Sequence, residues 1–341
     1  MIIFIYVILL FLILRFSVTI FNFLSNPKLG KYGKHFTDKV SIIIDASQSH
    51  ECLISLLDSI VHQDYQNYDV IIGNSELLLN REAIERFLKG HEAFRFADPS
   101  ASPLNSLAKQ TDGDYLLFLN PYTTIHNGFI NSMLYRTKVF DLALLSIIPS
   151  QALNNFKQSI FLPLNDFLLL NLIPLRLVRL FQSPAFALAS DKCLFFNASI
   201  YRNYEWQAGR EAVRAVKLDS FKAETLLGDR LIRFSLPANT TGLLKSAGRN
   251  LLLNFGNNSI AALFYLTLVF VGPLFMLLNY EYALLILPVG LIFLTRVMIS
   301  FLVRQNPLKN IILHPLQMLI LFIALLNAVI LKILTLTKDK N

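Results

Sequence analysis

Four long apolar blocks constrain this chain more than any other feature, because a membrane-spanning helix needs about 20 consecutive apolar residues. The first block, Ile2–Leu24, contains Arg15 as its single charge. The other three lie together near the C-terminal end, at about Ile260–Asn279, Tyr282–Val303 and Ile311–Leu336. These blocks explain why 54% of the 341 residues are hydrophobic and only 16% are charged. The sequence therefore predicts an integral membrane protein with a water-soluble insert.

The blocks divide the chain into three predicted parts. Residues 1–24 are an N-terminal transmembrane anchor, because they lack the basic start and the small-residue cleavage site of a signal peptide. Residues 25–255 form the soluble domain, and residues 256–341 supply three C-terminal membrane helices. Within the domain, segments near 156–181 and 239–254 are apolar but interrupted, which is typical of helices that lie on a bilayer surface. Packing in an ordinary core is the alternative for 156–181.

Lysine and arginine residues near the blocks predict the orientation. Basic residues follow the first block and precede the second, at Lys28, Lys31, Lys34, Lys39, Lys245 and Arg249. Because basic loops stay on the inner side, the soluble domain is expected in the cytoplasm, beside the plasma (inner) membrane. Lys338 and Lys340 then fall on the outer side if all three late blocks span. Either the rule is violated at the C-terminal end, or one block is re-entrant.

The charge distribution and the cysteine content indicate which classes of partner and which metal or disulfide sites to expect. The net charge of +8 is spread along the chain and gathers near the apolar blocks, which favours the lipid bilayer as a partner over nucleic acid. Two cysteines without metal-type spacing, Cys52 and Cys193, favour neither a disulfide framework nor a zinc site. Arg296, inside the third block, is either a functional intramembrane charge or a side chain that snorkels to the interface.

The insert alternates short β-branched runs with amphipathic segments. Strands are expected at 39–45, 68–73, 91–97, 114–119 and 142–147, and helices at 47–62, 77–90, 104–110 and 131–139. This order predicts an α/β fold with a mostly parallel sheet and helices on both faces. Two further strands are expected at 192–196 and 230–234, with an amphipathic helix between them at about 209–227.

Ligands of such sheets bind beyond the C-terminal ends of the strands. That rule selects three groups of polar residues: Asp45 with Ala46, the run Gly73–Glu76 that includes Asn74, and Asn120–Tyr122. Each group ends an expected strand, so we expect the groups to share one edge of the sheet. The alternative is that they are ordinary turn residues.

Several framework segments, in order, resemble those of the membrane-bound family 2 glycosyltransferases. Lys39–Ile44 resembles the opening strand of that family, Leu56–Tyr65 the end of its first helix, and Tyr68–Ile72 its second strand. Asp112–Leu119 resembles the strand that approaches its metal motif, and His314–Pro315 the start of the final span in one subgroup. The resemblance covers nearly the whole chain.

The resemblance implies a GT-A type domain between N-terminal and C-terminal transmembrane helices. It further implies transfer of a sugar from a nucleotide-sugar donor to a membrane-associated or lipid-linked acceptor. Donor contacts fall on Asp45, Asn74, Asn120 and Tyr122. The family holds Mg or Mn at an Asp-x-Asp motif, whereas this chain has Asn120, Pro121 and Tyr122 there. Since neither outer position supplies a negative charge, no metal site and no cofactor are predicted.

One catalytic candidate follows from the same resemblance. The segment Ala212–Asp219 is similar to the region that supplies the general base of the family, with Asp219 on the acidic position. An inverting transfer needs a carboxylate to accept the proton of the attacking hydroxyl. The alternative is that Asp219 is a solvated helix residue near Lys217 and Lys222.

Two functions from different classes remain open at the level of sequence, so enzymatic activity is left undecided. The first is a glycosyltransferase that acts at the membrane. The second is a catalytically inactive pseudoenzyme that serves as partner or scaffold for another glycosyltransferase, which the loss of the donor-site carboxylates favours. A transporter is disfavoured, because the apolar blocks lack paired intramembrane charges.

Overall fold

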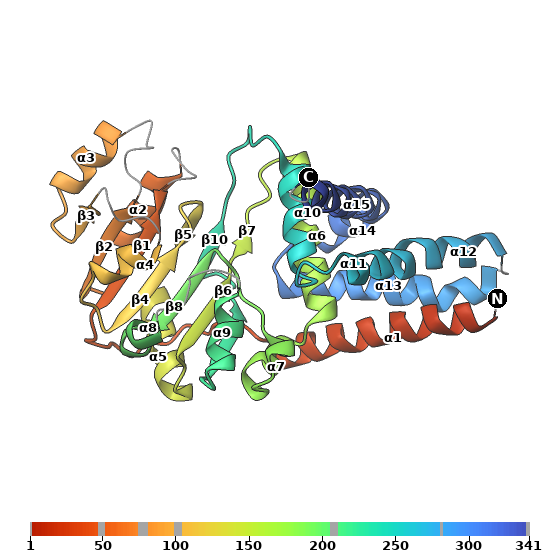
Figure 1. Ribbon diagram of the computed structural model, residues 1–341, viewed down its shortest axis with the longest axis horizontal. Helices are drawn as coiled ribbons and strands as arrows, with labels where there is room; N and C mark the ends of the chain where they lie inside the picture. The colour runs from red at the N-terminus through yellow and green to blue at the C-terminus, as the bar shows by residue number, and fades with distance from the viewer. Residues whose placement is uncertain are drawn as a thin grey trace. The chain divides into compact units, whose positions relative to one another are not determined.

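The computed structural model describes residues 2–46, 52–73, 81–98, 104–204, 211–279 and 282–338 (Figure 1). They form two compact units, each built from separate stretches of the chain. The sheet unit comprises Pro27–Ala152 and Leu175–Pro237. The helical unit comprises Met1–Asn26, Leu153–Pro174 and Ala238–Asn341. The segments 153–174 and 238–255, which the sequence analysis assigned to the soluble domain, therefore pack with the apolar helices.

The sheet unit contains a seven-stranded sheet in the order β3-β2-β1-β4-β8-β6-β9. Its strands are β1 (Val40–Asp45), β2 (Tyr68–Gly73), β3 (Phe94–Phe96), β4 (Tyr115–Leu119), β6 (Leu144–Ile148), β8 (Cys193–Asn197) and β9 (Ala223–Leu227). Only β8 runs antiparallel to its neighbours in this sheet. The prediction of a mostly parallel sheet is therefore confirmed.

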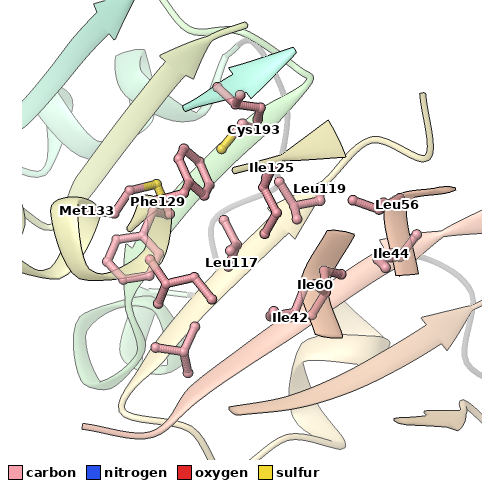
Figure 2. Packing of buried hydrophobic residues seen from close by; sticks show 14 of the residues in the cluster. Ile42, Ile44, Leu56, Ile60, Leu117, Leu119, Ile125, Phe129, Met133 and Cys193 are labelled. Atoms are coloured by element: carbon pink, nitrogen blue, oxygen red, sulfur yellow. The ribbon is translucent and has the colours of Figure 1, made fainter. Parts of the chain in front are cut away.

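Helices cover both faces of this sheet. They are α2 (Leu53–Val61), α3 (Arg81–Lys89), α4 (Leu104–Lys109), α5 (Phe129–Phe140), α7 (Leu175–Leu180), α8 (Ala198–Tyr204) and α9 (Ala212–Leu218). One face packs on α2 and α5 through the cluster in Figure 2, which includes Ile42, Ile44, Leu56, Ile60, Leu117, Leu119, Phe129 and Met133. On the other face, Phe118 and Phe196 contact Tyr201 of α8, with ring centroids 5.7 and 4.8 Å away. Alternate residues of each strand thus enter different cores.

The helix expected at 209–227 is shorter than the sequence analysis indicated. Helix α9 ends at Leu218, Ser220 has a positive φ of 64°, and Ala223–Leu227 is the buried strand β9. Glu224 of this strand is fully buried and forms an ion pair with Arg136 at 2.6 Å. Two further cations lie at 3.1 and 3.5 Å from it, Arg179 and Arg176. Because these partners are distant in sequence, local periodicity did not reveal the strand.

A smaller sheet of three strands completes the sheet unit. It consists of β5 (Thr123–Ile125), β10 (Ile232–Phe234) and β7 (Ser150–Gln151), in the order β5-β10-β7. β5 begins just after the end of β4, so the small sheet starts at the edge where the parallel strands of the large sheet end.

The helical unit contains α1 (Ile2–Ser25), α6 (Phe156–Leu172), α10 (Leu243–Leu253), α11 (Ser259–Leu266), α12 (Gly272–Asn279), α13 (Tyr282–Leu302), α14 (Pro307–Ile312) and α15 (His314–Lys338). Within the described residues, three helical stretches are long and apolar enough to cross a membrane: Ile3–Ser25, Leu285–Leu302 and His314–Leu334. This is consistent with the expected membrane protein. The block at 260–279 is different, because a π-helical turn at Thr267–Val271 divides it into α11 and α12.

Helix α10 approaches α15 closely at Gly248. A Cβ atom on this residue would lie 2.3 Å from the carbonyl oxygen of Ala324 and 3.2 Å from Cβ of Ala328. Because the nearest atom belongs to the backbone of α15, no rotamer change relieves the contact. Glycine at this position therefore sets the distance between the two helices.

We expect Gly248→Ala to lower the free energy of unfolding by about 1–3 kcal/mol, since the added methyl group forces α10 away from α15. Gly290→Ala on α13 is the matched control, because nothing lies within 4 Å of its Cβ position. The control should be neutral or stabilising by up to about 1 kcal/mol. Thermal unfolding of the two purified variants in one detergent measures both. Equal midpoints would show that the close approach does not constrain α10.

Candidate functional site

The register of the large sheet places four strand ends side by side. Asp45 pairs with Gly73, Ile44 lies opposite Leu119, and Leu119 lies opposite Cys193. The residues at this edge are therefore Gly73 and Asp45, which end β2 and β1, Asn120, which follows β4, and Lys192, which precedes β8. Neighbouring strands are about 4.8 Å apart, so these residues form a continuous row. We call these four residues the strand-end row.

The row contains the point at which the connections of the sheet diverge. From β1 the sheet continues through β2 to β3 in one direction, while β4 lies on the other side of β1. In open α/β sheets such a switch point leaves a crevice beyond the strand ends, where ligands bind. Asp45 and Asn120 follow the two strands that flank it, and both are partly buried. Two of the sequence-predicted residues are thus brought together.

Asn120 is held by its own backbone. Its Oδ1 atom accepts a hydrogen bond from the backbone N–H of Tyr122 at 3.0 Å. Its carbonyl oxygen accepts from the backbone N–H of Thr123 at 2.9 Å and from the Thr123 hydroxyl at 2.6 Å. This is the geometry of an Asx turn, in which a short polar side chain shapes the chain reversal. The turn leads β4 directly into β5.

Tyr122 connects the same turn to the small sheet. Its carbonyl oxygen accepts from the backbone N–H of Ser235 at 2.9 Å, and its ring lies edge-on to Phe234 with centroids 6.1 Å apart. The ring is partly buried. Tyr122 therefore lies in the turn next to the strand-end row, where an aromatic ring suits a flat ligand.

Lys192 is a site residue that the sequence analysis did not select. Its carbonyl oxygen accepts from the backbone N–H of Asn120 at 3.0 Å. Its ammonium nitrogen lies 3.6 Å from the ring centroid of Phe234, so a cation–π contact holds the charge beside the row. The signal for it is the pair Asp191-Lys192 directly before an apolar strand. That signal is informative only when β8 is known to be antiparallel, because an antiparallel strand begins where its parallel neighbours end.

The remaining predicted residues do not join the row. Asn74 lies outside the described residues, so its proposed role remains a prediction. Asp219 follows α9 and is exposed, four residues before β9 begins. Because β9 runs parallel to β6, its first residues lie at the opposite edge of the sheet. The nearby pair of Lys222 with Asp141, at 3.5 Å, lies at that opposite edge as well.

The residues at the expected metal position do not fit a divalent cation. Asn120 is neutral and its Oδ1 already accepts a hydrogen bond, while the Tyr122 ring packs beside Phe234. Across the part of the chain that the structure describes, no group of three or more His, Cys, Asp or Glu side chains is arranged to hold a metal. Burial also raises the pKa of the Cys193 thiol beside the row, which keeps it protonated and a poor ligand.

Comparison with known proteins places the fold. No protein-family model matches the chain, and no curated protein matches it in sequence. Its structure is similar to a mannosyltransferase from Pyrobaculum calidifontis, PcManGT, solved in complex with GDP-Man and Mn2+. The TM-score is 0.53 and the identity 10%, over 95% of this chain and 98% of that chain. A second match is TarS 1–349 of S. aureus with UDP-GlcNAc, with TM-score 0.42, identity 12%, and coverage of 85% and 89%. The chain thus has a glycosyltransferase-like fold.

We expect Asn120→Ala to lower the free energy of unfolding by about 1 kcal/mol, because the backbone N–H of Tyr122 loses its acceptor. Asn120→Asp keeps an acceptor oxygen at the same position and should lose less than half as much. Thermal unfolding in detergent, at a pH where the new carboxyl is ionised, compares the two variants. If both lose the same amount, the turn is not what the Asn120 side chain stabilises.

Proposed function

We propose that the sheet unit is a family 2, GT-A type glycosyltransferase domain whose nucleotide-sugar donor binds at the strand-end row. One observation carries the proposal: the switch point of the sheet is flanked by Asp45 and Asn120, in a fold similar to a mannosyltransferase that binds GDP-Man. The membrane-spanning helices favour a membrane-associated, lipid-linked acceptor. We place the sheet unit at the cytoplasmic face of the inner membrane, where nucleotide sugars are made.

The residues of the strand-end row and Tyr122 offer different contacts to the nucleoside and to the diphosphate of a nucleotide-sugar donor. The Asp45 carboxylate is an acceptor for the hydroxyl or N–H donors of a nucleoside, and Tyr122 offers an aromatic surface to its base. We further propose Asn74 as a nucleoside contact, as the resemblance implies. Lys192 brings a positive charge to the same edge, where it stabilises the charge of a departing diphosphate. A fixed ammonium there supplies part of what a divalent cation supplies in other enzymes, and no metal is needed for that contact.

The proposed transfer also needs a general base for the acceptor hydroxyl. The sequence-based candidate, Asp219, lies at the opposite edge of the sheet from the row. Helix α9 is joined to β9 by residues 219–222 and packs against it, so the N-terminal end of α9 lies one helix length away from Asp219. Glu211, the residue that precedes α9, lies at that end and is exposed. We therefore propose Glu211 as the stronger candidate to accept the acceptor-hydroxyl proton.

A second function has its own observation. Asn120 is engaged in a turn, and neither Asn120 nor Tyr122 at the expected metal-ligand positions is a carboxylate, which is the state expected of an inactive relative. In that case the chain keeps the fold and acts as partner or scaffold for a competent glycosyltransferase. Fold similarity alone does not distinguish the two functions.

Calorimetric titration of the full-length protein in detergent separates them. GDP and UDP are titrated with and without Mn2+. A transferase without a metal site binds one of them with an affinity that Mn2+ does not change. Binding that strengthens with Mn2+ would contradict the assignment of Asn120 and Tyr122 as nonligands. If neither nucleotide binds, the scaffold is favoured.

We expect Lys192→Ala to weaken binding of the nucleoside diphosphate by about 10- to 100-fold, the range for loss of a charged hydrogen-bond donor. Lys192→Arg should retain most of the affinity. Lys89→Ala is the matched control, because Lys89 is an exposed lysine of the same unit at the end of α3. The same titration measures all three variants. An affinity loss shared by Lys192→Ala and Lys89→Ala would point to general electrostatics.

We expect Asp219→Asn to leave transfer unchanged, while Glu211→Gln lowers the rate by about 100-fold or more, as for loss of a general base. The assay measures nucleoside diphosphate released from a panel of nucleotide sugars in the presence of extracted membrane lipids. Nucleotide affinity should be the same in both variants, because neither residue lies in the row. A selective loss of turnover in Asp219→Asn would restore the sequence-based assignment.

A further inference from the structure

The helical unit contains a cavity of about 420 Å³, bounded by residues of α1, α6, the π-helical turn, α12, α13 and α15. This volume lies within the roughly 300–1,000 Å³ typical of small-molecule sites. Its wall changes character along α13. Leu285, Pro288 and Val289 form an apolar end, and Thr295 joins Arg15 and His314 at a polar end. Leu285 and Thr295 are ten residues apart, which is about 15 Å along a helix.

Arg15 brings a positive charge to the polar end. It is 6% exposed, and its Nε atom donates to Oδ1 of Asn171 at 3.1 Å. Its guanidinium lies 5.3 Å from the ring centroid of Phe167, which also lines the cavity. Arg15 is about 20 Å from the start of α1 and about 15 Å from its end, too far for the charge to snorkel to the bilayer surface.

A second buried arginine lies behind the same ring. Arg296 is 1% exposed, its guanidinium lies 4.6 Å from the Phe167 centroid, and it donates to Gln317. Its Nε atom has no hydrogen-bond partner. Asp166 of the same unit accepts instead from Gln305 at 2.9 Å. Within the described residues no carboxylate pairs with Arg15, whereas the charge of the Asp166 carboxylate acts on Arg296. Arg296 therefore does not snorkel, which was one of the two alternatives in the sequence.

His314 adds an unused polar atom to the same end. It lines the cavity, is 8% exposed, and its Nδ1 atom has no hydrogen-bond partner. Buried unpartnered polar atoms and uncompensated charges are both costly inside an apolar region. Two guanidinium groups and one imidazole thus surround Phe167, and within the described residues Asp166 acts on Arg296 while Arg15 has no carboxylate partner.

We infer that this cavity binds an anionic lipid, with its phosphate at Arg15 and His314 and its hydrocarbon chain along α12 and α13. The phosphate compensates the charge of Arg15, for which the described residues supply no carboxylate partner, and accepts hydrogen bonds from the Arg15 guanidinium and from the Nδ1–H tautomer of His314. The chain occupies the wall from Val289 to Leu285. Only a ligand with both parts satisfies both ends of the cavity. The site lies within the helical unit and does not depend on whether the sheet unit transfers sugars.

Thermal unfolding of the full-length protein in detergent tests this site with three probes. Dioleoyl phosphatidic acid carries both parts, dioleoylglycerol has the same chains without the phosphate, and inorganic phosphate has no chain. At saturating concentration we expect phosphatidic acid to raise the unfolding midpoint by about 5 °C, and the other two by less than about 1 °C. An equal rise with dioleoylglycerol would overturn the role of the anion. A rise with inorganic phosphate alone would show a free-phosphate site.

Two variants and one control locate the effect. Arg15→Met replaces the charge with an apolar chain of similar length, which often preserves stability at a buried site. It should abolish the shift with phosphatidic acid, whereas Arg249→Gln, which changes an exposed arginine of α10, should keep it. Leu285→Trp fills the apolar end and leaves Arg15 in place, so it should abolish the shift even if Arg15→Met fails to fold. A full shift in either Arg15→Met or Leu285→Trp would overturn the proposal.

Discussion

The register between β1 and β4 is the constraint on which the rest of the sheet unit depends. Ile44 lies opposite Leu119, and both strands are buried on both faces. A slip by one residue would turn Ile42 and Ile44 away from α2 and toward the opposite core. The apolar side chains therefore fix the register, and the register fixes which polar residues meet at the edge. Asp45 and Asn120 are neighbours because Ile44 and Leu119 are.

Much of this arrangement was predictable, because strands buried on both faces have continuous apolar runs. Val40–Asp45, Tyr68–Gly73 and Tyr115–Leu119 were all expected as strands, and their parallel order follows from the alternation with helices. The row of Asp45 and Asn120 follows from that order. The sequence could not show whether β8 runs parallel or antiparallel to its neighbours, because an apolar run is compatible with either direction. Lys192 was missed for that reason, and Asp219 was selected without knowing at which edge it lies.

Long-range ion pairs explain the other difference between sequence and structure. The segment 209–227 has helical periodicity, yet its last five residues form β9, which pairs with β6 and places Glu224 in ion pairs with Arg136, Arg176 and Arg179. Similarly, hydropathy identified the apolar block at 260–279 but not its division into α11 and α12 by a π-helical turn. Predictions from sequence patterns use only local periodicity and hydropathy. These features depend instead on contacts between residues that are far apart in sequence.

The two units resolve buried charge in different ways. In the sheet unit, Glu224 is fully buried and three arginines converge on it, so the carboxylate that must leave water is compensated from within the chain. In the helical unit, Arg15 and Arg296 converge on an aromatic ring; the charge of Asp166 acts on Arg296, but the described residues provide Arg15 with no carboxylate. A cation–π contact stabilises a buried cation by about 2 kcal/mol, whereas the desolvation of an unpaired charge in an apolar interior costs several kcal/mol. An anion from outside the chain restores that balance, and the apolar end of the adjoining cavity indicates that the anion is attached to a hydrocarbon chain.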